Sequence, residues 1–343
     1  MKGIYKKVMT GMACMVGTCV GSALLCVTPV EAAPALYRSE LTNEWISSSI
    51  QTQRPIAAMV DNEKIALPHY GLSTADVVYE MTNSLKNEGV TRFMVLQKDW
   101  GNIQRMGSIR SVRPANLQIA PEWNAVVCHD GGPFYIKPYL DLDYVDNFSG
   151  SFSRIKNGKP REFTEYISPG NLSRNFAASG YTTQYNGYYQ GAHYLFAPQE
   201  TPVNLAATPG NVNCTRIDLP YQHNKPYLEY NPATGLYGYN EYGKPHLDPG
   251  NNNAQMSFRN LLIQNTVCIP LDANGYMTFQ MSDANRSGYY ITGGKAIAVT
   301  WAKANDITPT RYYDATGKEI VLNTGKTYVA IVPSDLWANI SIR

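Results

Sequence analysis

The chain has 343 residues, of which 44% are hydrophobic and 16% charged, so it can bury a sizeable core and is not a disordered protein. Its 25 Tyr, 27 Gly and 21 Pro favour strands and turns and argue against an all-helical fold. Beyond Ala32 the chain holds equal numbers of basic and acidic side chains, and this neutral balance argues against a nucleic-acid-binding protein.

The segment from Met1 to Ala32 has the pattern of a signal peptide. Lys2, Lys6 and Lys7 precede an uncharged stretch from 8 to 28, and Val30-Glu31-Ala32 offers small residues for cleavage. We expect cleavage after Ala32, so that the body of the protein is extracytoplasmic: secreted, periplasmic or associated with the cell envelope. Two alternatives stay open, an uncleaved membrane anchor and lipidation at a cysteine of this segment. Only these two would link the protein to a membrane.

The length suggests two domains, and the change in sequence texture places their boundary near residue 198. Residues 33–53 are polar and unpatterned, as in a tether. Residues 54–198 alternate short apolar strands with helices, which predicts an α/β domain with a mixed sheet. The strands are expected at 56–60, 76–80, 92–97 and 125–128, and the helices at 111–120 and 169–178. Ser111 is expected near the N-cap of the first helix, with Pro114 in its first turn.

Residues 199–343 are predicted to form a mostly antiparallel β domain. Short Tyr-rich and β-branched runs are separated there by turn sequences at 231–235, 314–317 and 323–325, a spacing typical of hairpins. The predicted fold class is therefore α+β, with an N-terminal α/β domain followed by a mostly antiparallel β domain.

A group of arginines is the first candidate site. These residues are Arg92, Arg105, Arg110 and Arg113. Arg110 and Arg113 bracket the predicted helix start at Ser111, where two guanidinium forks could clamp a phosphate or a carboxylate. The alternative is that the arginines form structural salt bridges with Asp61, Asp76 and Glu80.

The second candidate is the run Cys128-His129-Asp130-Gly131-Gly132. Adjacent strand residues point to opposite faces, so Cys128 and His129 are poorly placed to act as a catalytic dyad. His129 at a strand end is better placed to face a cleft, and Gly131 and Gly132 allow a close backbone approach or a positive φ. A plain strand-to-loop turn is the alternative.

Other chemistries find less support. The five histidines are far apart and none forms a ligand pair at helix or hairpin spacing, so no metal site and no cofactor are expected. Ser111 lacks the sequence of a nucleophile elbow. Asp61 and Glu80 could form an acid–base pair acting on a glycan. Of the cysteines after residue 32, Cys128, Cys214 and Cys268, either two form one disulfide or all three are thiols.

Several motifs occur in the order of a known family. In the first half they are 54–62 (RPIAAMVDN), 71–80 (GLSTADVVYE), 89–93 (GVTRF), 108–113 (SIRSVR) and 129–132 (HDGG). In the second half they are 230–237 (YNPATGLY), 243–248 (GKPHLD), Trp301 and 323–328 (NTGKTY). On these residues the chain resembles the YerB-like family of bacterial secreted and membrane-anchored proteins, over roughly residues 52 to 335.

The resemblance implies two domains and a place near the cell envelope, where members are commonly lipoproteins, but the family has no assigned biochemical function. The candidate residues that fall on the family pattern are Asn62, Glu80, Arg92, Arg110, Ser111, Arg113 and His129. Cys128 does not. Gly170 stands where the family pattern leads us to expect a histidine, and this departure favours binding over catalysis.

We therefore predict a protein that binds an anionic small molecule, or a cell-wall or surface-glycan fragment, through an arginine-rich cleft. The expected ligand-binding residues are Asn62, Glu80, Arg92, Arg110, Ser111, Arg113, His129, Gly131 and Gly132. One alternative is a hydrolase or transferase acting on cell-wall polymer, with Glu80 or Asp61 as the acid–base group and His129 assisting. A second alternative is a scaffold for envelope synthesis proteins.

Overall fold

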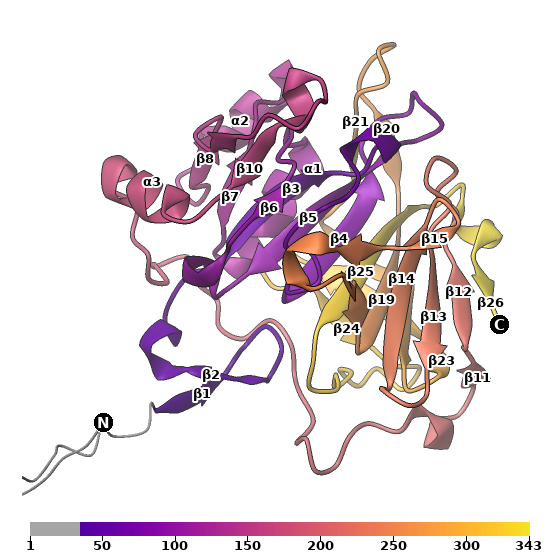
Figure 1. The fold of residues 1–343 in the computed structure, drawn as a ribbon. Helices are drawn as coiled ribbons and strands as arrows, with labels where there is room; N and C mark the ends of the chain where they lie inside the picture. Colours follow the sequence, from indigo (N-terminus) through magenta and orange to yellow (C-terminus); the bar gives the residue numbers. More distant parts are fainter. Residues whose placement is uncertain (1–34) are drawn as a thin grey trace, which may run out of the picture. The chain divides into compact units, whose positions relative to one another are not determined.

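The computed structural model describes residues 35–343, which form one compact unit (Figure 1). The predicted signal peptide, residues 1–32 with cleavage after Ala32, lies outside the described residues. Within the described part of the chain, no helix is both long and apolar enough to cross a membrane.

An eleven-stranded mixed sheet forms the centre of this unit. In order across the sheet its strands are β11 (Val212–Asn213), β23 (Lys295–Lys303), β22 (Asp283–Thr292), β19 (Asn260–Thr266), β25 (Thr327–Pro333), β4 (Val77–Thr82), β5 (Thr91–Gln97), β3 (Ile56–Asp61), β7 (Val126–His129) and β8 (Asn147–Ser149), with β24 (Arg311–Tyr313) paired to β23. The pairs β19–β25, β25–β4, β3–β7 and β7–β8 are parallel. Every residue of β3, β4 and β5 is buried, which explains why their sequences read as nearly continuous apolar runs.

Smaller antiparallel sheets surround the central one. A six-stranded sheet contains β15 (Lys244–Pro245), β14 (Leu236–Glu241), β13 (Tyr227–Asn231), β12 (Arg216–Asp218), β26 (Ser341–Ile342) and β18 (Ser257–Phe258). A three-stranded sheet contains β6 (Met106–Gly107), β10 (Glu165–Ile167) and β9 (Ser153–Arg154). Three two-stranded pairs are β1 (Leu36–Arg38) with β2 (Trp45–Ser47), β16 (Leu247–Asp248) with β17 (Ala254–Gln255), and β20 (Cys268–Pro270) with β21 (Met277–Phe279).

The described residues contain three short α-helices: α1 (Pro114–Ile119), α2 (Lys137–Leu140) and α3 (Asn171–Ser179). α1 begins later than predicted, because Arg113 rather than Ser111 is its N-cap, and a 3₁₀ helix over Ala120–Trp123 continues it. α1 packs on one face of the central sheet, and the six-stranded sheet covers the other face (Figure 1). One hydrophobic core therefore lies on each side of the central sheet. These features confirm the predicted α+β fold class.

The central sheet runs through both halves of the sequence. β25 pairs in parallel with β4, from Thr327 opposite Val77 to Ile331 opposite Met81. The boundary predicted near residue 198 is therefore not a break in the main sheet. This pairing could not be predicted because it joins strands from distant parts of the chain.

Residues 35–53, which belong to the segment predicted to be a tether, are folded. Within this segment, β1 and β2 form a hairpin that a 3₁₀ helix over Ser48–Ile50 follows. Leu41 in the hairpin loop is fully buried, and Glu40 forms an ion pair with Lys98 at 2.5 Å. A buried leucine, an ion pair and hydrogen bonds to distant residues such as Tyr185 and Thr324 hold the segment, and none of these contacts is visible as a local sequence pattern.

Candidate functional site

The predicted arginine cluster is built on the antiparallel pair of β3 and β5, in which Asp61 lies opposite Arg92. Arg92 donates from Nη2 to Asp61 Oδ2 over 2.7 Å and from Nη1 to the Ser111 carbonyl over 2.8 Å. The backbone N–H of Arg110 binds the Met59 carbonyl of β3, and its Nε donates to the same Asp61 Oδ2 over 3.0 Å. One buried carboxylate thus holds two guanidiniums, and Ser111 contributes its carbonyl.

Arg113 supplies the third guanidinium of the cluster. From its N-cap position, its side chain donates to the Asn83 carbonyl (Nε, 3.3 Å) and to the Val112 carbonyl (Nη1, 3.1 Å). Its guanidinium lies 5.5 Å from the centre of the Tyr276 ring. Within residues 35–343, every hydrogen-bond acceptor of this partly buried cation is therefore uncharged.

The charges of the cluster do not balance. Burial raises the pKa of Asp61, but Arg92 and Arg110 outweigh this effect and hold it below its usual value. Burial and the charge of Arg92 lower the pKa of Arg113 to about 9. Glu63 is a further carboxyl near the arginines, and burial together with Asp61 raises its pKa. The arginine cluster, defined as Arg92, Arg110 and Arg113, thus holds more positive charge than its neighbours neutralise.

The segment 129–132 lies beside this cluster. The N–H of Val112, which precedes Arg113, donates to the Gly131 carbonyl over 3.0 Å. Gly131 has a φ of +67°, and a Cβ on Gly132 would come within 3.0 Å of the Val112 carbonyl. Gly131 therefore allows the positive φ, and Gly132 allows the close approach of the Val112 carbonyl.

His129 does not face solvent, contrary to our expectation. Its side chain is buried, with Nδ1 2.8 Å from the Gly131 carbonyl and Nε2 3.1 Å from Asn147 Oδ1. Both ring nitrogens are thus engaged inside the protein, by a backbone carbonyl and by a neighbouring side chain. The Cys128 thiol is also buried, and burial raises its pKa far above the usual value. All three cysteines in residues 35–343 are free thiols.

Glu80 and Asn62 were predicted to join the arginines, and the structure places them elsewhere. Side chains alternate along a strand, so Glu80 shares the face of Val78, which packs toward the six-stranded sheet, whereas Arg92 shares the opposite face with Met94. The Glu80 carboxylate accepts hydrogen bonds from Asn62 Nδ2, Thr91 Oγ1, Asn224 Nδ2, Tyr239 Oη and Tyr328 Oη. Burial raises its pKa.

This placement bears on the acid–base alternative. Asp61 and Glu80 both have no exposed surface, and they lie on opposite faces of the central sheet. A pair that acts on a glycan must flank the scissile bond from an open cleft. The geometry of these two carboxyls gives the hydrolase interpretation no support.

Arg105 lies apart from the arginine cluster. Its guanidinium is 4.5 Å from the centre of the Tyr70 ring and 5.8 Å from that of Tyr166. It therefore forms cation–π contacts at a different place on the protein.

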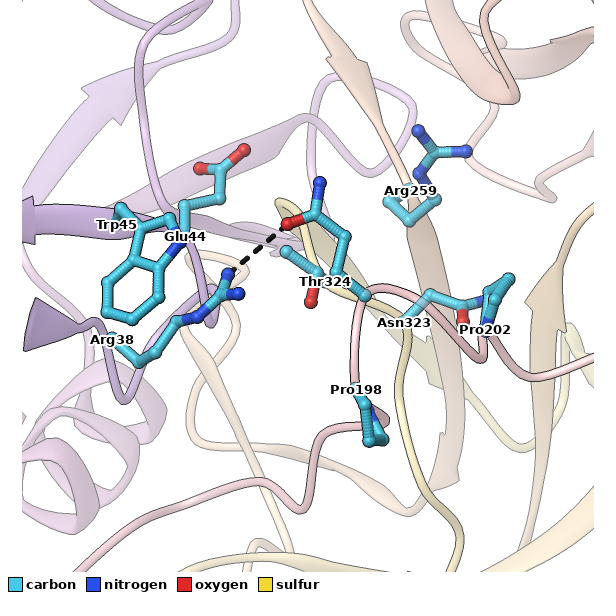
Figure 2. Close-up of a pocket in the computed structure, with 9 residues that line it drawn as sticks. Arg38, Glu44, Trp45, Pro198, Pro202, Arg259, Asn323 and Thr324 are labelled. Carbon is cyan, nitrogen blue, oxygen red and sulfur yellow. Dashed lines mark hydrogen bonds between the residues drawn. The ribbon is translucent and has the colours of Figure 1, made fainter.

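Sequence reasoning missed a cavity of about 500 Å³ beside the β1–β2 hairpin (Figure 2). Its residues include Arg38 and Trp45 of the hairpin and Arg259 from the second half of the chain. The Arg38 guanidinium lies 4.0 Å from the centre of the Trp45 ring, and its Nη1 donates to Gln199 Oε1 over 3.4 Å. Trp45 is 56% exposed. A tryptophan in a polar segment was the one available signal for this pocket.

The structure also contains a cluster of possible metal ligands. The spacing of the histidines in the sequence had predicted no metal site. His69, Glu241 and His246 are all buried, and one ring nitrogen of each histidine and a carboxylate oxygen of Glu241 lie within 4.8 Å of one another. The three residues come from both halves of the chain, so no local motif marks them.

The fold and the site together define an α+β protein in which one mixed sheet, buried on both faces, carries an unbalanced arginine cluster. Two family models match the chain: "Protein of unknown function (DUF3048) N-terminal domain" over residues 41–182 and "Protein of unknown function (DUF3048) C-terminal domain" over residues 217–329. Together they span more than half of the chain, which therefore belongs to this family, the YerB-like proteins.

Comparison with individual proteins agrees. The chain is 24% identical over 318 residues to "Putative lipoprotein YerB" of Bacillus subtilis strain 168, and the match covers 89% of this chain and 88% of that protein. The crystal structure of YerB from Bacillus subtilis matches with a TM-score of 0.74 at 20% identity, covering 90% of this chain and 99% of that one. The structural match shows that the two proteins share a fold.

Proposed function

We propose that the protein works outside the cytoplasm at the cell envelope and binds an anionic ligand at the arginine cluster. The envelope location is supported by the name of the Bacillus relative, which describes a lipoprotein, and by the signal-peptide pattern from Met1 to Ala32. The proposed ligand class is a cell-wall or surface-glycan fragment that carries phosphate or carboxylate groups.

The observation that carries this proposal is the environment of Arg113. Its guanidinium is partly buried beside two further guanidiniums, and its acceptors are uncharged carbonyls. Buried charges in proteins are normally paired, because removing a charge from water is costly. A phosphate or carboxylate next to Arg113 would supply the missing countercharge and accept two hydrogen bonds from one guanidinium. Arg110, with 21% of its side chain exposed, gives the site an edge that faces solvent.

Calorimetric titration with sugar phosphates and uronic-acid oligosaccharides tests the proposal. We expect Arg113→Gln to weaken binding by about 10-fold or more, since a hydrogen bond to a charged group contributes about 1.5–3 kcal/mol. Arg105→Gln is the matched control, because it removes an arginine that lies outside the cluster, and its affinity should equal that of the wild type.

Two outcomes would overturn the proposal. One is equal affinity of the Arg113→Gln variant and the wild type for every probe. The other is a loss of affinity in Arg38→Gln or Arg259→Gln with none in Arg113→Gln, which would move the ligand to the cavity of Figure 2.

A further inference from the structure

The cluster of His69, Glu241 and His246 is held by the backbone on two sides. Glu241 ends β14, and the turn Tyr242-Gly243, with φ values of +50° and +74°, brings the chain back so that His246 lies beside it. The His246 Nδ1 is 2.9 Å from Glu241 Oε1. Two residues in the positive-φ region are typical of a tight hairpin turn, so this pair is set by local geometry.

His69 approaches the same point from the N-terminal half. It lies between the 3₁₀ helix Lys64–Ala66 and β4, and its ring centre is 5.0 Å from that of His246. The side chain of His69 has no exposed surface. Three potential ligands from two distant segments therefore converge in the interior.

Three ring nitrogens of this cluster have no hydrogen-bond partner among the described residues. They are Nδ1 and Nε2 of His69 and Nε2 of His246. A buried polar atom without a partner is costly, and proteins rarely retain one without a reason.

We propose that His69, Glu241 and His246 bind a divalent first-row transition metal of the zinc type. Two imidazole nitrogens with one carboxylate oxygen are a donor set that zinc uses in proteins, whereas calcium and magnesium prefer oxygen ligands throughout. Zinc bonds of about 2.1 Å place tetrahedral donors about 3.4 Å apart, whereas the donors here lie within 4.8 Å of one another, so side-chain rotations that draw them together by up to about 1.4 Å complete the site. The ion would occupy one ring nitrogen of each histidine, including one of the two unpartnered nitrogens of His69.

The surroundings provide support for the ligands and access for an ion. Asn224 Nδ2 donates to Glu241 Oε2 over 3.3 Å and to Glu80 Oε1 over 2.7 Å, so a second carboxylate network holds the ligand in place. Glu241 and His246 also line a cavity of about 440 Å³. This cavity gives the ion a route and leaves room for a further ligand.

Metal binding by the wild-type protein is the direct test. The whole protein is freed of metal with a chelator, equilibrated with Zn²⁺ and analysed for bound metal, and its crystals are examined by anomalous diffraction at the zinc edge. We expect one Zn²⁺ per chain, located between the three side chains. No stoichiometric zinc, or zinc located only elsewhere, would overturn the proposal without the need for any variant.

Variants sharpen the test. We expect His246→Ala to weaken Zn²⁺ binding by at least about 100-fold. His223→Ala is the matched control, because this partly exposed histidine bonds to the Asn87 carbonyl outside the cluster, and it should keep the wild-type affinity. Equal Zn²⁺ affinity of the two variants would contradict the proposal.

His69→Leu gives a second readout that a merely structural histidine would not produce. Without metal, this variant should melt no lower than the wild type, because it removes two unpartnered buried nitrogens. With Zn²⁺ the melting temperature should rise in the wild type alone, since a ligand stabilises only the form that binds it. An equal rise in both proteins would show that zinc binds without His69.

Discussion

Two buried charged clusters lie on the α1 face of the central sheet, and they differ in whether their charges are balanced. In the first, Glu122 of the 3₁₀ helix after α1 accepts hydrogen bonds from Lys303 Nζ (2.8 Å), from Thr310 Oγ1 (2.7 Å) and from Tyr79 Oη (3.1 Å), and His193 Nε2 lies 3.2 Å away. Lys303 directs its remaining donors to two carbonyls of the following loop. Despite burial, the charge of Lys303 holds the pKa of Glu122 well below its usual value.

The arginine cluster differs because its charges are left unequal. Asp61 is shared between Arg92 and Arg110, and Arg113 has only carbonyls as acceptors. In the closed cluster the charges of Glu122 and Lys303 neutralise each other inside the protein, so this ion pair serves the fold. The excess charge of the arginine cluster could be neutralised by an anion, and this difference between the two clusters is the basis of the proposed binding role.

Breaking the closed cluster should have the largest effect. We expect Lys303→Met to lower the free energy of unfolding by about 3–5 kcal/mol, because it leaves Glu122 buried without its cation. Urea denaturation measures this change. The double variant with Glu122→Gln should recover at least half of the loss, and a single-variant loss below about 1 kcal/mol would show that the cluster is not closed as described.

Asp76 extends the comparison to a carboxyl without a cation in contact. Its Oδ2 accepts the Lys98 N–H over 2.6 Å, and burial raises its pKa to about 7. Because the folded protein favours the protonated carboxyl of Asp76, this group makes its full contribution to the free energy of unfolding below about pH 4. The contribution is lost as the pH rises through 7. Unfolding measured across this range should show a decline of about 2–4 kcal/mol in the wild type that Asp76→Asn reduces. Parallel pH profiles would contradict the assignment.

Cys128 is a buried, uncharged side chain in the same sheet, and it can be compared with the buried charged groups. Replacing this buried thiol by serine should cost about 1–3 kcal/mol of stability, because the hydroxyl lacks a good partner there. Anion binding should be unchanged, which calorimetry can check on the folded variant. Loss of binding in a well-folded Cys128→Ser protein, together with a silent Arg113→Gln, would favour a thiol-based function instead.

Arg113→Gln should have the smallest effect on stability. No carboxylate loses its partner, so the free energy of unfolding should change by less than about 1 kcal/mol, whereas ligand affinity falls. Denaturation and calorimetry on the same variant separate the two quantities. A destabilisation as large as that of Lys303→Met would show that Arg113 belongs to the fold rather than to a binding site.

Local patterns predicted the parts of the molecule that depend on neighbouring residues. The apolar runs of β3, β5 and β7 mark buried strands, and Pro114 marks the first turn of α1. Arg92, Arg110 and Arg113 come together because β5 and the segment after β6 both lie beside β3.

The features that could not be predicted from the sequence depend on strand register and on pairing between distant segments. Whether Glu80 faces the arginines or the six-stranded sheet depends on a single residue of register, and no composition measure contains that information. His69 meets His246 only because the β14–β15 hairpin lies beside residue 69, which is distant from it in the sequence. Spacing rules for metal ligands apply within one element and cannot detect such a meeting.

The parallel pairing of β25 with β4 has a consequence for how the protein is made. A chain that emerges from the ribosome or an export channel in sequence order presents β4 long before β25 exists. Until then the edge of β4 has unpaired backbone groups on an apolar strand, the kind of edge that promotes aggregation. Biogenesis therefore has to keep the nascent N-terminal half from misassociating until the last long strand arrives.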